Sequence, residues 1–331
     1  MNLAGKRVLI TGGAGFIGSH LVRELAPASD VIVIDDFSTG RRENLAGVPG
    51  LTVLEADVCD PSTFRDVLEE VDVVFHLAVR CLRSSIGDPL GAHQVNTVGT
   101  LNVLLAASAA RIERFVYVSS SEVYGDAVST PMDEDHPLNP RTPYAASKLA
   151  GEACARSFMR TYGLPVVVVR PFNAYGPRSH LDGPSGELIP RFVARAAAGL
   201  PLAVFGDGHQ TRNFTWVEET AAGIRLAGET DALVGETVNI AHEQPVSVLE
   251  IAHLVRELLG SSAPIVHRCE RPGDVHCQHA GTRRAVDVMG FKAAVSIEEG
   301  LHRYITWVQS QAEPTLRAPE EVVNWSSMSL D

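Results

Sequence analysis

Residues 8–18 read Val8-Leu9-Ile10-Thr11-Gly12-Gly13-Ala14-Gly15-Phe16-Ile17-Gly18, and this stretch decides the fold. An apolar strand runs directly into a turn with glycines at 12, 15 and 18, after which a helix is expected. Glycine permits the tight turn and lets the backbone approach a ligand, while N–H groups at the helix start bind a pyrophosphate. Gly-rich turns also join ordinary strands and helices, so the interpretation depends on the neighbouring strand as well.

A second buried strand, Val31-Ile32-Val33-Ile34, ends at Asp35. A carboxylate at this place accepts hydrogen bonds from the adenosine ribose hydroxyls and repels a 2′-phosphate. We therefore expect NAD as the cofactor. Arg41 and Arg42 are close enough in sequence that NADP stays open as an alternative.

Short apolar strands alternate with helical segments through the first half of the chain. We expect strands at 7–11, 31–35, 52–55, 72–76, 114–119 and 165–170, and helices at 18–26, 61–69, 92–110 and 144–162. This alternation predicts an α/β fold with a doubly wound parallel (Rossmann) sheet that binds ligands at the carboxyl ends of its strands.

The pattern changes after Arg170, where Gly, Pro and polar residues surround one helix expected at 189–198. A strand at 238–240 and a helix at 247–259 come next. We expect residues 1–170 and 211–242 to form the NAD-binding domain. Residues 171–210 and 243–311 are expected to form a smaller α/β substrate-binding domain, and 312–331 an exposed tail.

Composition limits the possible partners. The formal net charge of −12 argues against nucleic acid and anionic membranes, and the apolar runs are too short to span a bilayer. With no leader pattern at residue 1, a cytoplasmic protein is expected. Five cysteines without Cys-x-x-Cys spacing predict no disulfide framework, and the His and Cys residues of 267–279 lack the ligand spacing of a zinc site. No metal is expected.

The segment Tyr144-Ala145-Ala146-Ser147-Lys148 places a phenol and an amine on one face of an expected helix. A phenol is a poor base near pH 7, but a nearby ammonium and a positively charged nicotinamide would lower the pKa of Tyr144. Tyr144 then accepts the proton of a substrate hydroxyl while hydride passes to the cofactor. Ser120, at the end of the strand expected at 114–119, is placed to hold the same oxygen. The spacing alone also fits an ordinary solvated pair.

Together these motifs resemble the extended short-chain dehydrogenase/reductase family of NAD-dependent nucleotide-sugar epimerases, dehydratases and decarboxylases. The matching segments are 11–18, 35–40, 56–58, 76–78, 119–125, 144–148, 170–176, 205–208, 210–212 and 271–274. They run through nearly the whole chain and are specific for the family, though not for one reaction within it.

The resemblance implies roles for individual residues. Cofactor contacts are expected from Gly12, Gly15, Phe16, Ile17, Gly18, Asp35, Asp36, Ser38, Thr39, Gly40, Asp57, Val58, Leu77, Ala78 and Lys148. It implies substrate contacts from Asn173, Phe205, Arg212 and Arg271, and further substrate contacts are expected from Arg83 and Arg191, which lie outside the matching segments. Of these, Asn173, Arg212 and Arg271 would hold the diphosphate, which suits the paired N–H donors of guanidinium groups, and Phe205 would lie against the base.

The reaction is expected to begin with oxidation at the sugar C4, and the fate of the keto intermediate depends on Ser121 and Glu122. Family members that eliminate water or CO2 usually carry Glu at this position, whereas 4-epimerases carry a small residue. We therefore expect dehydration, in which Glu122 moves protons at C5 and C6. A 4-epimerase, a uronate decarboxylase and a net dehydrogenase stay open. A structural role for Glu122 is the plain alternative.

Two features depart from the family pattern. Deoxythymidine-diphosphate-glucose dehydratases typically have Asp-Glu where Ser121-Glu122 stands here. The loop around Arg80 and Arg83 carries two arginines where small polar residues are usual. Arg83 can meet a substrate carboxylate, a cofactor phosphate or solvent. Apolar positions on the helices expected at 92–110 and 144–162 predict a homodimer.

Overall fold

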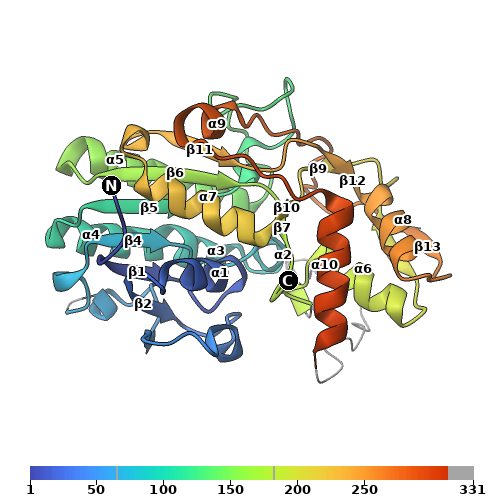
Figure 1. Ribbon diagram of the computed structural model, residues 1–331. Helices are drawn as coiled ribbons and strands as arrows, with labels where there is room; N and C mark the ends of the chain where they lie inside the picture. Colours follow the sequence, from blue (N-terminus) through green and yellow to red (C-terminus); the bar gives the residue numbers. More distant parts are fainter. Residues whose placement is uncertain (65, 182, 312–331) are drawn as a thin grey trace.

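Seven parallel strands form the central sheet of the computed structural model, which describes residues 1–64, 66–181 and 183–311 (Figure 1). Their order across the sheet is β3 (Thr52–Glu55), β2 (Asp30–Asp35), β1 (Arg7–Thr11), β4 (Val73–His76), β5 (Arg114–Val118), β6 (Val166–Pro171) and β11 (Thr237–Ile240). Each of the six strands expected in the first half of the chain is present within one residue at either end. The order reverses between β1 and β4, which is where such a sheet opens a crevice for ligands. The predicted doubly wound fold is confirmed.

Helices cover both faces of the sheet. On one face lie α1 (Phe16–Leu25) and α7 (Val217–Glu229), which pack against each other and share an apolar cluster with alternate residues of β1, β4, β5 and β6. On the other face lie α4 (Thr100–Ala110) and α5 (Pro143–Tyr162), which bury Leu104 and Phe158 with the remaining strand residues. Because both faces are covered, the strands read as continuous Val and Ile runs rather than as an alternating pattern.

Two expected helices differ from the structure. Two short 3₁₀ turns, η2 (Pro61–Phe64) and η3 (Leu68–Glu70), stand where one helix was expected at 61–69, so that prediction is wrong. Phe64 and Leu68 are both buried and lie four residues apart, as two residues on the apolar face of a longer helix would, which explains the prediction. The helix expected at 92–110 begins earlier, with α3 (Pro89–His93), and passes through a π-helical segment, η4 (Gln94–Gly99), before α4.

The second half of the chain adds a smaller layer beyond the carboxyl ends of the strands, at the right in Figure 1. It contains α6 (Leu188–Ala197), α8 (Val248–Leu258), α10 (Ile297–Ser310) and three two-stranded sheets. The sheets pair β8 (Leu202–Phe205) with β13 (Ile265–Arg268), β7 (Ala174–Tyr175) with β10 (Thr215–Trp216), and β9 (Thr211–Arg212) with β12 (Val246–Ser247). Phe192, Ile251 and Leu301 belong to its own apolar cluster.

The segment after β13 returns to the sheet. Ala285 of α9 (Arg283–Met289) and Phe291 belong to the cluster beneath α1 and α7, although both fall in the range 243–311 expected to form the smaller domain. We keep the division into two domains as a proposal, with 283–293 packed on the sheet. The tail expected at 312–331 lies outside the described residues.

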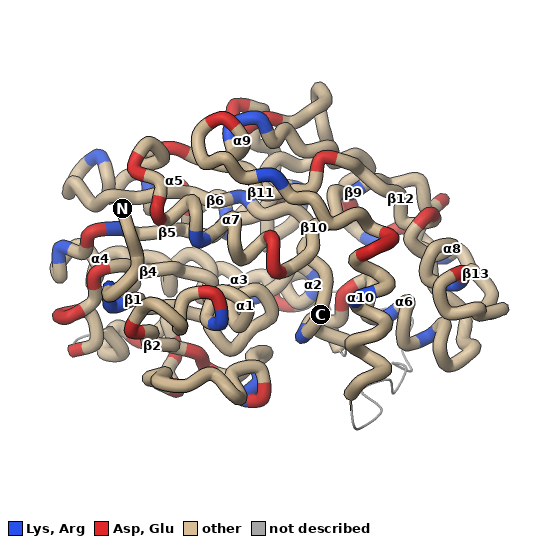
Figure 2. Tube along the Cα trace, in the orientation of Figure 1, with Lys and Arg blue, Asp and Glu red and all other residues tan. Residues whose placement is uncertain are grey.

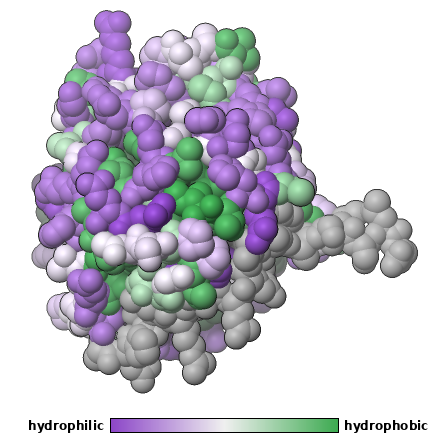
Figure 3. All heavy atoms as spheres, turned by 90° about the vertical axis from the view of Figure 1, so that its right-hand side faces the viewer, coloured by the Kyte–Doolittle hydropathy of each residue, from purple (hydrophilic) through white to green (hydrophobic). Residues whose placement is uncertain are grey.

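Charged residues of both signs are interspersed along the chain (Figure 2). On the face formed by the smaller layer, hydrophobic side chains gather near the centre among hydrophilic ones (Figure 3). No helix within the described ranges is long and apolar enough to cross a membrane. The five cysteines are free thiols, and the described residues contain no group of three or more His, Cys, Asp or Glu side chains placed to hold a metal ion.

Candidate active site

Two adjoining cavities lie along the carboxyl ends of the strands. The first extends along the β1–α1 turn, the end of β2 and the residues after β4 and β5, and the second extends from there toward α6, β8 and β9. Ten residues line both cavities: Phe16, Ile17, Val79, Cys81, Arg83, Ser120, Glu122, Tyr144, Asn173 and Glu187. The residues expected to react therefore lie where the two cavities meet.

The glycines of the first turn are required by close backbone approach. A Cβ on Gly18 would lie 2.1 Å from the carbonyl oxygen of Gly12, and one on Gly12 would lie 2.7 Å from the amide nitrogen of Ala78. Gly12 also has a φ of +71°, which favours glycine. Gly15 is the N-cap of α1 and makes no side-chain cap, so the N–H groups of the first helical turn face the cavity. Such a turn fits a pyrophosphate.

The far end of the first cavity is acidic. Asp35 accepts hydrogen bonds from the amides of Ala14 and Phe37, both at 2.9 Å, and burial raises its pKa. Asp36 and Asp57 line the same end, an arrangement that suits ribose hydroxyls and opposes a 2′-phosphate. Arg42, which left NADP open, pairs with Glu55 and stacks 4.1 Å from the centre of the Phe37 ring.

The structure brings nearly all expected cofactor residues to this cavity. Its walls include Gly12, Gly15, Phe16, Ile17, Gly18, Asp35, Asp36, Ser38, Thr39, Asp57, Val58, Leu77, Ala78 and Lys148. Gly40 instead packs behind Asp35, where a Cβ would lie 2.6 Å from the carboxylate oxygen. A glycine at this position leaves room for the Asp35 side chain.

Tyr144 and Lys148 project from the first turns of α5, which Thr142 caps by accepting a hydrogen bond from the amide of Ala145 at 3.2 Å. Ser120 lies just after β5 and hydrogen-bonds to the Tyr144 side chain. Lys148 donates to the carbonyl oxygen of Val118 at 2.6 Å and lies 4.7 Å from the centre of the Tyr117 ring. Three elements thus place a hydroxyl, a phenol and an amine on one wall.

The pKa of Tyr144 differs from the expected direction. The pKa is raised to about 12, chiefly by burial and then by the Glu122 and Cys81 charges, while the hydrogen bond with Ser120 and the Arg83 charge oppose the rise. The lowered pKa was expected from a nearby ammonium together with a positively charged nicotinamide; in the protein alone, the Lys148 amine is bonded to the backbone of β5. Burial also lowers the pKa of Lys148 to about 7, against the opposing charge of Glu152.

Glu122 lies in η5 (Ser121–Tyr124), a 3₁₀ turn capped by Ser120, whose hydroxyl accepts the amide of Glu122 at 3.2 Å. Burial raises the pKa of Glu122, while Arg212 and Arg271 oppose that shift. The Gln278 amide donates to its carboxylate at 3.4 Å and accepts from the Ser121 hydroxyl at 3.3 Å. A carboxyl with a raised pKa serves as acid or base near neutral pH.

Basic residues line the second cavity. Arg191 of α6, Arg212 of β9, Arg271, Phe205 and Asn173 are all on its walls, as expected for substrate contacts. Asp274 accepts from Arg212 at 2.9 Å and lies 4.0 Å from Arg271, so one carboxylate orients two guanidinium groups. Arg271 lies 5.7 Å from the centre of the Phe205 ring. A planar base and a diphosphate fit this combination.

Several wall contacts were not expected. Cys81 precedes α2 (Leu82–Gly87), and Arg83 of that helix donates to the carbonyl of Ser185 at 2.9 Å, which ties the helix to the segment before α6. Glu187 lines both cavities, and Gln278 contacts Glu122. Sequence spacing holds no signal for these contacts, because they join segments far apart in the chain. Glu152 is different: it lies four residues after Lys148 on the same helix face.

Comparisons with known proteins identify the family. A model of the family described as "NAD dependent epimerase/dehydratase family" matches residues 8–241. UDP-glucuronic acid decarboxylase 1 of Arabidopsis thaliana is 36% identical over 312 residues, covering 91% of this chain and 69% of the relative. A putative UDP-glucose 4-epimerase of Methanocaldococcus jannaschii is 32% identical over 307 residues, covering 92% and 98%.

A solved structure is similar over almost the same length. The dTDP-glucose 4,6-dehydratase DesIV of Streptomyces venezuelae, with NAD bound, superposes with a TM-score of 0.87 at 33% identity, covering 92% of this chain and 97% of that one. These findings confirm the expected family, the enzyme class and NAD as the cofactor. The relatives comprise a decarboxylase, an epimerase and a dehydratase, so they define a class of nucleotide-sugar enzymes rather than one reaction.

Proposed function

The chain belongs to the NAD dependent epimerase/dehydratase family, and we propose that it removes water from the hexose of a nucleoside-diphosphate sugar through a 4-keto intermediate. One observation carries the proposal. Glu122 places a half-buried carboxyl with a raised pKa at the junction of the two cavities, which Tyr144 also lines. Epimerisation by rotation of a keto intermediate needs no such group, whereas elimination needs a proton acceptor and donor.

The two cavities divide the ligands between them. The glycine turn and Asp35 are assigned to the NAD pyrophosphate and ribose, with the remaining lining residues of the first cavity around them. Asn173, Arg191, Arg212 and Arg271 are assigned to the diphosphate, and Phe205 to the base. NAD held there would supply a hydride acceptor that also serves as the hydride donor, so the reaction would be redox-neutral.

Tyr144 takes the proton of the C4 hydroxyl, and Ser120 holds the same oxygen through its hydrogen bond. Because the folded protein without cofactor raises the pKa of Tyr144, the phenol would become a base only when the positive charge of a bound nicotinamide adds to that of the Lys148 ammonium. Lys148 lies one helical turn away and lines the same cavity.

Glu122 then accepts the C5 proton, made acidic by the neighbouring ketone, and in its acid form donates a proton to the C6 hydroxyl, which leaves as water. The hydride held by the cofactor would go to C6, and C5 would regain a proton to balance the one that Tyr144 took from the C4 hydroxyl, so that Tyr144 and Glu122 end as they began. The sum is the loss of one water molecule, with no net oxidation. Ser121 and Gln278 keep the Glu122 carboxylate oriented.

Decarboxylation of a nucleotide-linked uronate is the second candidate, and Arg83 favours it. Arg83 lines both cavities together with Tyr144, and its charge lowers the pKa of Tyr144. That position suits a carboxylate at C6 of the sugar. In this case the 4-keto group would promote loss of CO2, and Glu122 would only protonate the carbon left behind.

We also propose a homodimer. Leu90, Val98 and Leu105, each about two helical turns after the one before, are 69%, 49% and 53% exposed along the segment from α3 to α4, and Tyr162 at the end of α5 is 63% exposed. Exposed apolar side chains on two adjacent helices suit a helical interface. Light scattering of the wild type and of Leu105→Glu tests the proposal: the wild type should have twice the mass of the chain, and the variant the mass of one chain.

Mass spectrometry of the products tests the reaction. The purified protein with NAD is incubated with a panel of nucleotide hexoses and nucleotide uronates. Loss of 18 mass units from a hexose supports dehydration, and loss of 44 from a uronate supports the second candidate. An unchanged mass with a new retention time would identify a 4-epimerase, and accumulation of free NADH a net dehydrogenase. Either result overturns the proposal.

A further inference from the structure

A buried ion pair lies directly behind the catalytic wall. The guanidinium of Arg170 on β6 donates two hydrogen bonds to Glu152 on α5, from Nε to Oε1 at 2.9 Å and from Nη2 to Oε2 at 2.8 Å. Both side chains are 1% exposed. A bidentate pair of this kind fixes the direction of the carboxylate as well as its charge.

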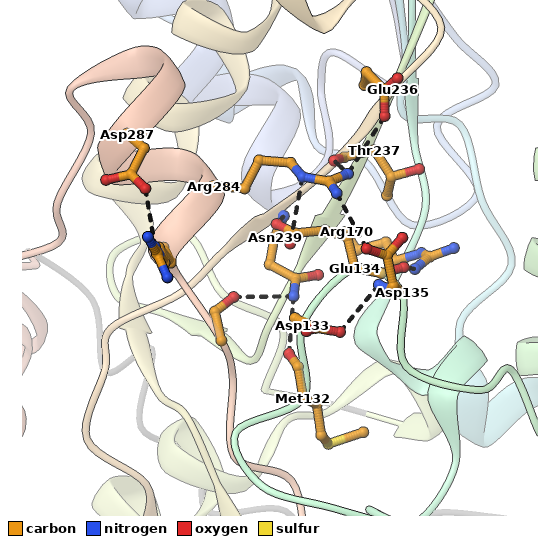
Figure 4. A network of polar contacts seen from close by, with 12 residues as sticks. Met132, Asp133, Glu134, Asp135, Arg170, Glu236, Thr237, Asn239, Arg284 and Asp287 are labelled. Atoms are coloured by element: carbon orange, nitrogen blue, oxygen red, sulfur yellow. Dashed lines mark hydrogen bonds and ion pairs between the residues drawn. The ribbon is translucent and has the colours of Figure 1, made fainter.

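Further contacts hold both partners. The hydroxyl of Ser119 donates to Glu152 Oε1 at 2.6 Å, and Ser119 directly precedes Ser120 at the cavity wall. Arg170 also donates to the Tyr124 hydroxyl at 2.8 Å. Figure 4 shows Arg170 beside a wider network in which Glu134 accepts the amide of Asn239 at 2.8 Å. Glu152 therefore links α5, the end of β5 and β6.

Lys148 precedes Glu152 by one helical turn, so the two side chains share a helix face. The other titratable groups around Lys148 are uncharged at neutral pH. On β4, His76 has its pKa lowered to about 3 by burial, and on β5 the pKa of Tyr117 is raised well above its usual value by burial. On α5, burial raises the pKa of Tyr144 to about 12.

The charged groups near this wall come from three elements. Glu152 and Arg156, whose guanidinium lies 3.6 Å from the Glu152 carboxylate, are on α5, and Arg170 is on β6. Glu122 is in η5, and its raised pKa reduces its charge. Among the described residues, Glu152 is the charge that supports the ammonium form of Lys148, while burial disfavours it. Without an opposite charge, an amine in this position would be a neutral base at pH 7.

We propose that Glu152 is a positioning residue for Lys148: held by Arg170 and Ser119, it supplies the buried negative charge that keeps the Lys148 ammonium protonated at the cavity wall. The effect of Glu152 on catalysis rests on the proposed function, because only a charged Lys148 favours the phenolate of Tyr144. The effect of Glu152 on the protonation of Lys148 does not depend on any reaction. In the described chain Glu152 lines neither of the two cavities, and so acts through Lys148.

The lysine content of the chain makes a direct test possible. There are three lysines, Lys6, Lys148 and Lys292, so labelling with ¹³C-lysine gives three side-chain NMR signals. Lys6 and Lys292 are 29% and 63% exposed in their side chains and form surface ion pairs. The variant Lys148→Met identifies the third signal by removing it. The full-length chain is titrated over a range of pH, and the midpoint of each signal is recorded.

We expect the wild-type Lys148 signal to titrate near pH 7, and Glu152→Gln to lower its midpoint on the order of one pH unit. The matched control is Glu134→Gln, which neutralises another buried carboxylate of the same region, 4% exposed in its side chain. Glu134→Gln should leave the Lys148 midpoint in place. An unchanged midpoint in Glu152→Gln, or an equal shift in the control, overturns the proposal.

Glu152→Gln leaves Arg170 without its bidentate charge partner, a change that can by itself prevent folding. The double variant Glu152→Gln/Arg170→Met removes both charges, and it should also lower the Lys148 midpoint. In active variants, the basic limb of the kcat/KM profile should move to lower pH with the midpoint. Failure of the proposed dehydration would alter the products but not the lysine titration, so the two outcomes are distinguishable.

Discussion

The amine of Lys148 donates to the carbonyl oxygen of Val118 at 2.6 Å, so the strand end and not Tyr144 holds this side chain. Burial has lowered the pKa of Lys148 from 10.5 to about 7 in the folded protein. Between these two values the unfolded chain binds more protons than the folded one, and stability therefore rises with pH across that window.

Lys148→Met removes this dependence. We expect the stability of the wild type relative to the variant to increase by about 3 kcal/mol between pH 6.5 and pH 9.5. Urea unfolding of both proteins at a series of pH values measures the difference. A constant difference across the range would show that Lys148 titrates with an ordinary pKa in the folded state.

Gly151 of α5 lies against Tyr117, and a Cβ there would come within 2.1 Å of the Tyr117 hydroxyl oxygen. Gly151→Ala should therefore push α5 away from β5, with a loss of roughly 1–3 kcal/mol in the free energy of unfolding and a lower kcat. The control is Ala153→Ser on the exposed side of the same helix, with an expected change below about 0.5 kcal/mol. Equal stability of the two variants would contradict the packing account.

Asp35 is the residue on which selection of NAD depends. Asp35→Asn removes the charge but keeps the shape of the side chain, and we expect its dissociation constant for NAD to rise about tenfold, since a hydrogen bond to a charged group contributes about 1.5–3 kcal/mol. Discrimination against NADP should also weaken. Calorimetric titration with both cofactors measures this, with Asp30→Asn, at the exposed start of β2, as the control. Unchanged NAD affinity in Asp35→Asn would remove Asp35 from the site.

Arg212 and Arg271 share Asp274 on the wall of the second cavity. Arg271→Gln should raise KM for the nucleotide sugar at least about tenfold and weaken binding of the free nucleoside diphosphate, while the affinity for NAD stays unchanged. Arg268→Gln, at an exposed position of β13, is the matched control. If Arg271→Gln weakened binding of NAD and not of the nucleotide sugar, the assignment of Arg271 to the substrate cavity would be contradicted.

The strands and the cofactor turn were predictable because their signals are local. Buried parallel strands read as runs such as Val166 to Val169, and the glycines of the first turn are required by contacts within the turn itself and with the residues that follow β4. The family motifs likewise led to both cavities, including Arg191, Arg212 and Arg271. The features that escaped prediction depend on tertiary contact. One such feature is the π-helical segment η4. The others are the contact of Gln278 with Glu122 and the hydrogen bond of Lys148 to the backbone of Val118, which both join segments far apart in the sequence.

The stopped-flow absorbance of Glu122→Gln at 340 nm, with mass analysis of the sugar, tests the central claim most directly. With NAD and a substrate of the wild type, we predict that the variant forms NADH through Tyr144, but releases the dehydrated product about 10²–10⁴-fold more slowly. Glu69→Gln, at an exposed 3₁₀ turn, controls for the substitution. Product release by Glu122→Gln at the wild-type rate would contradict the account, because elimination would then proceed without this carboxylate.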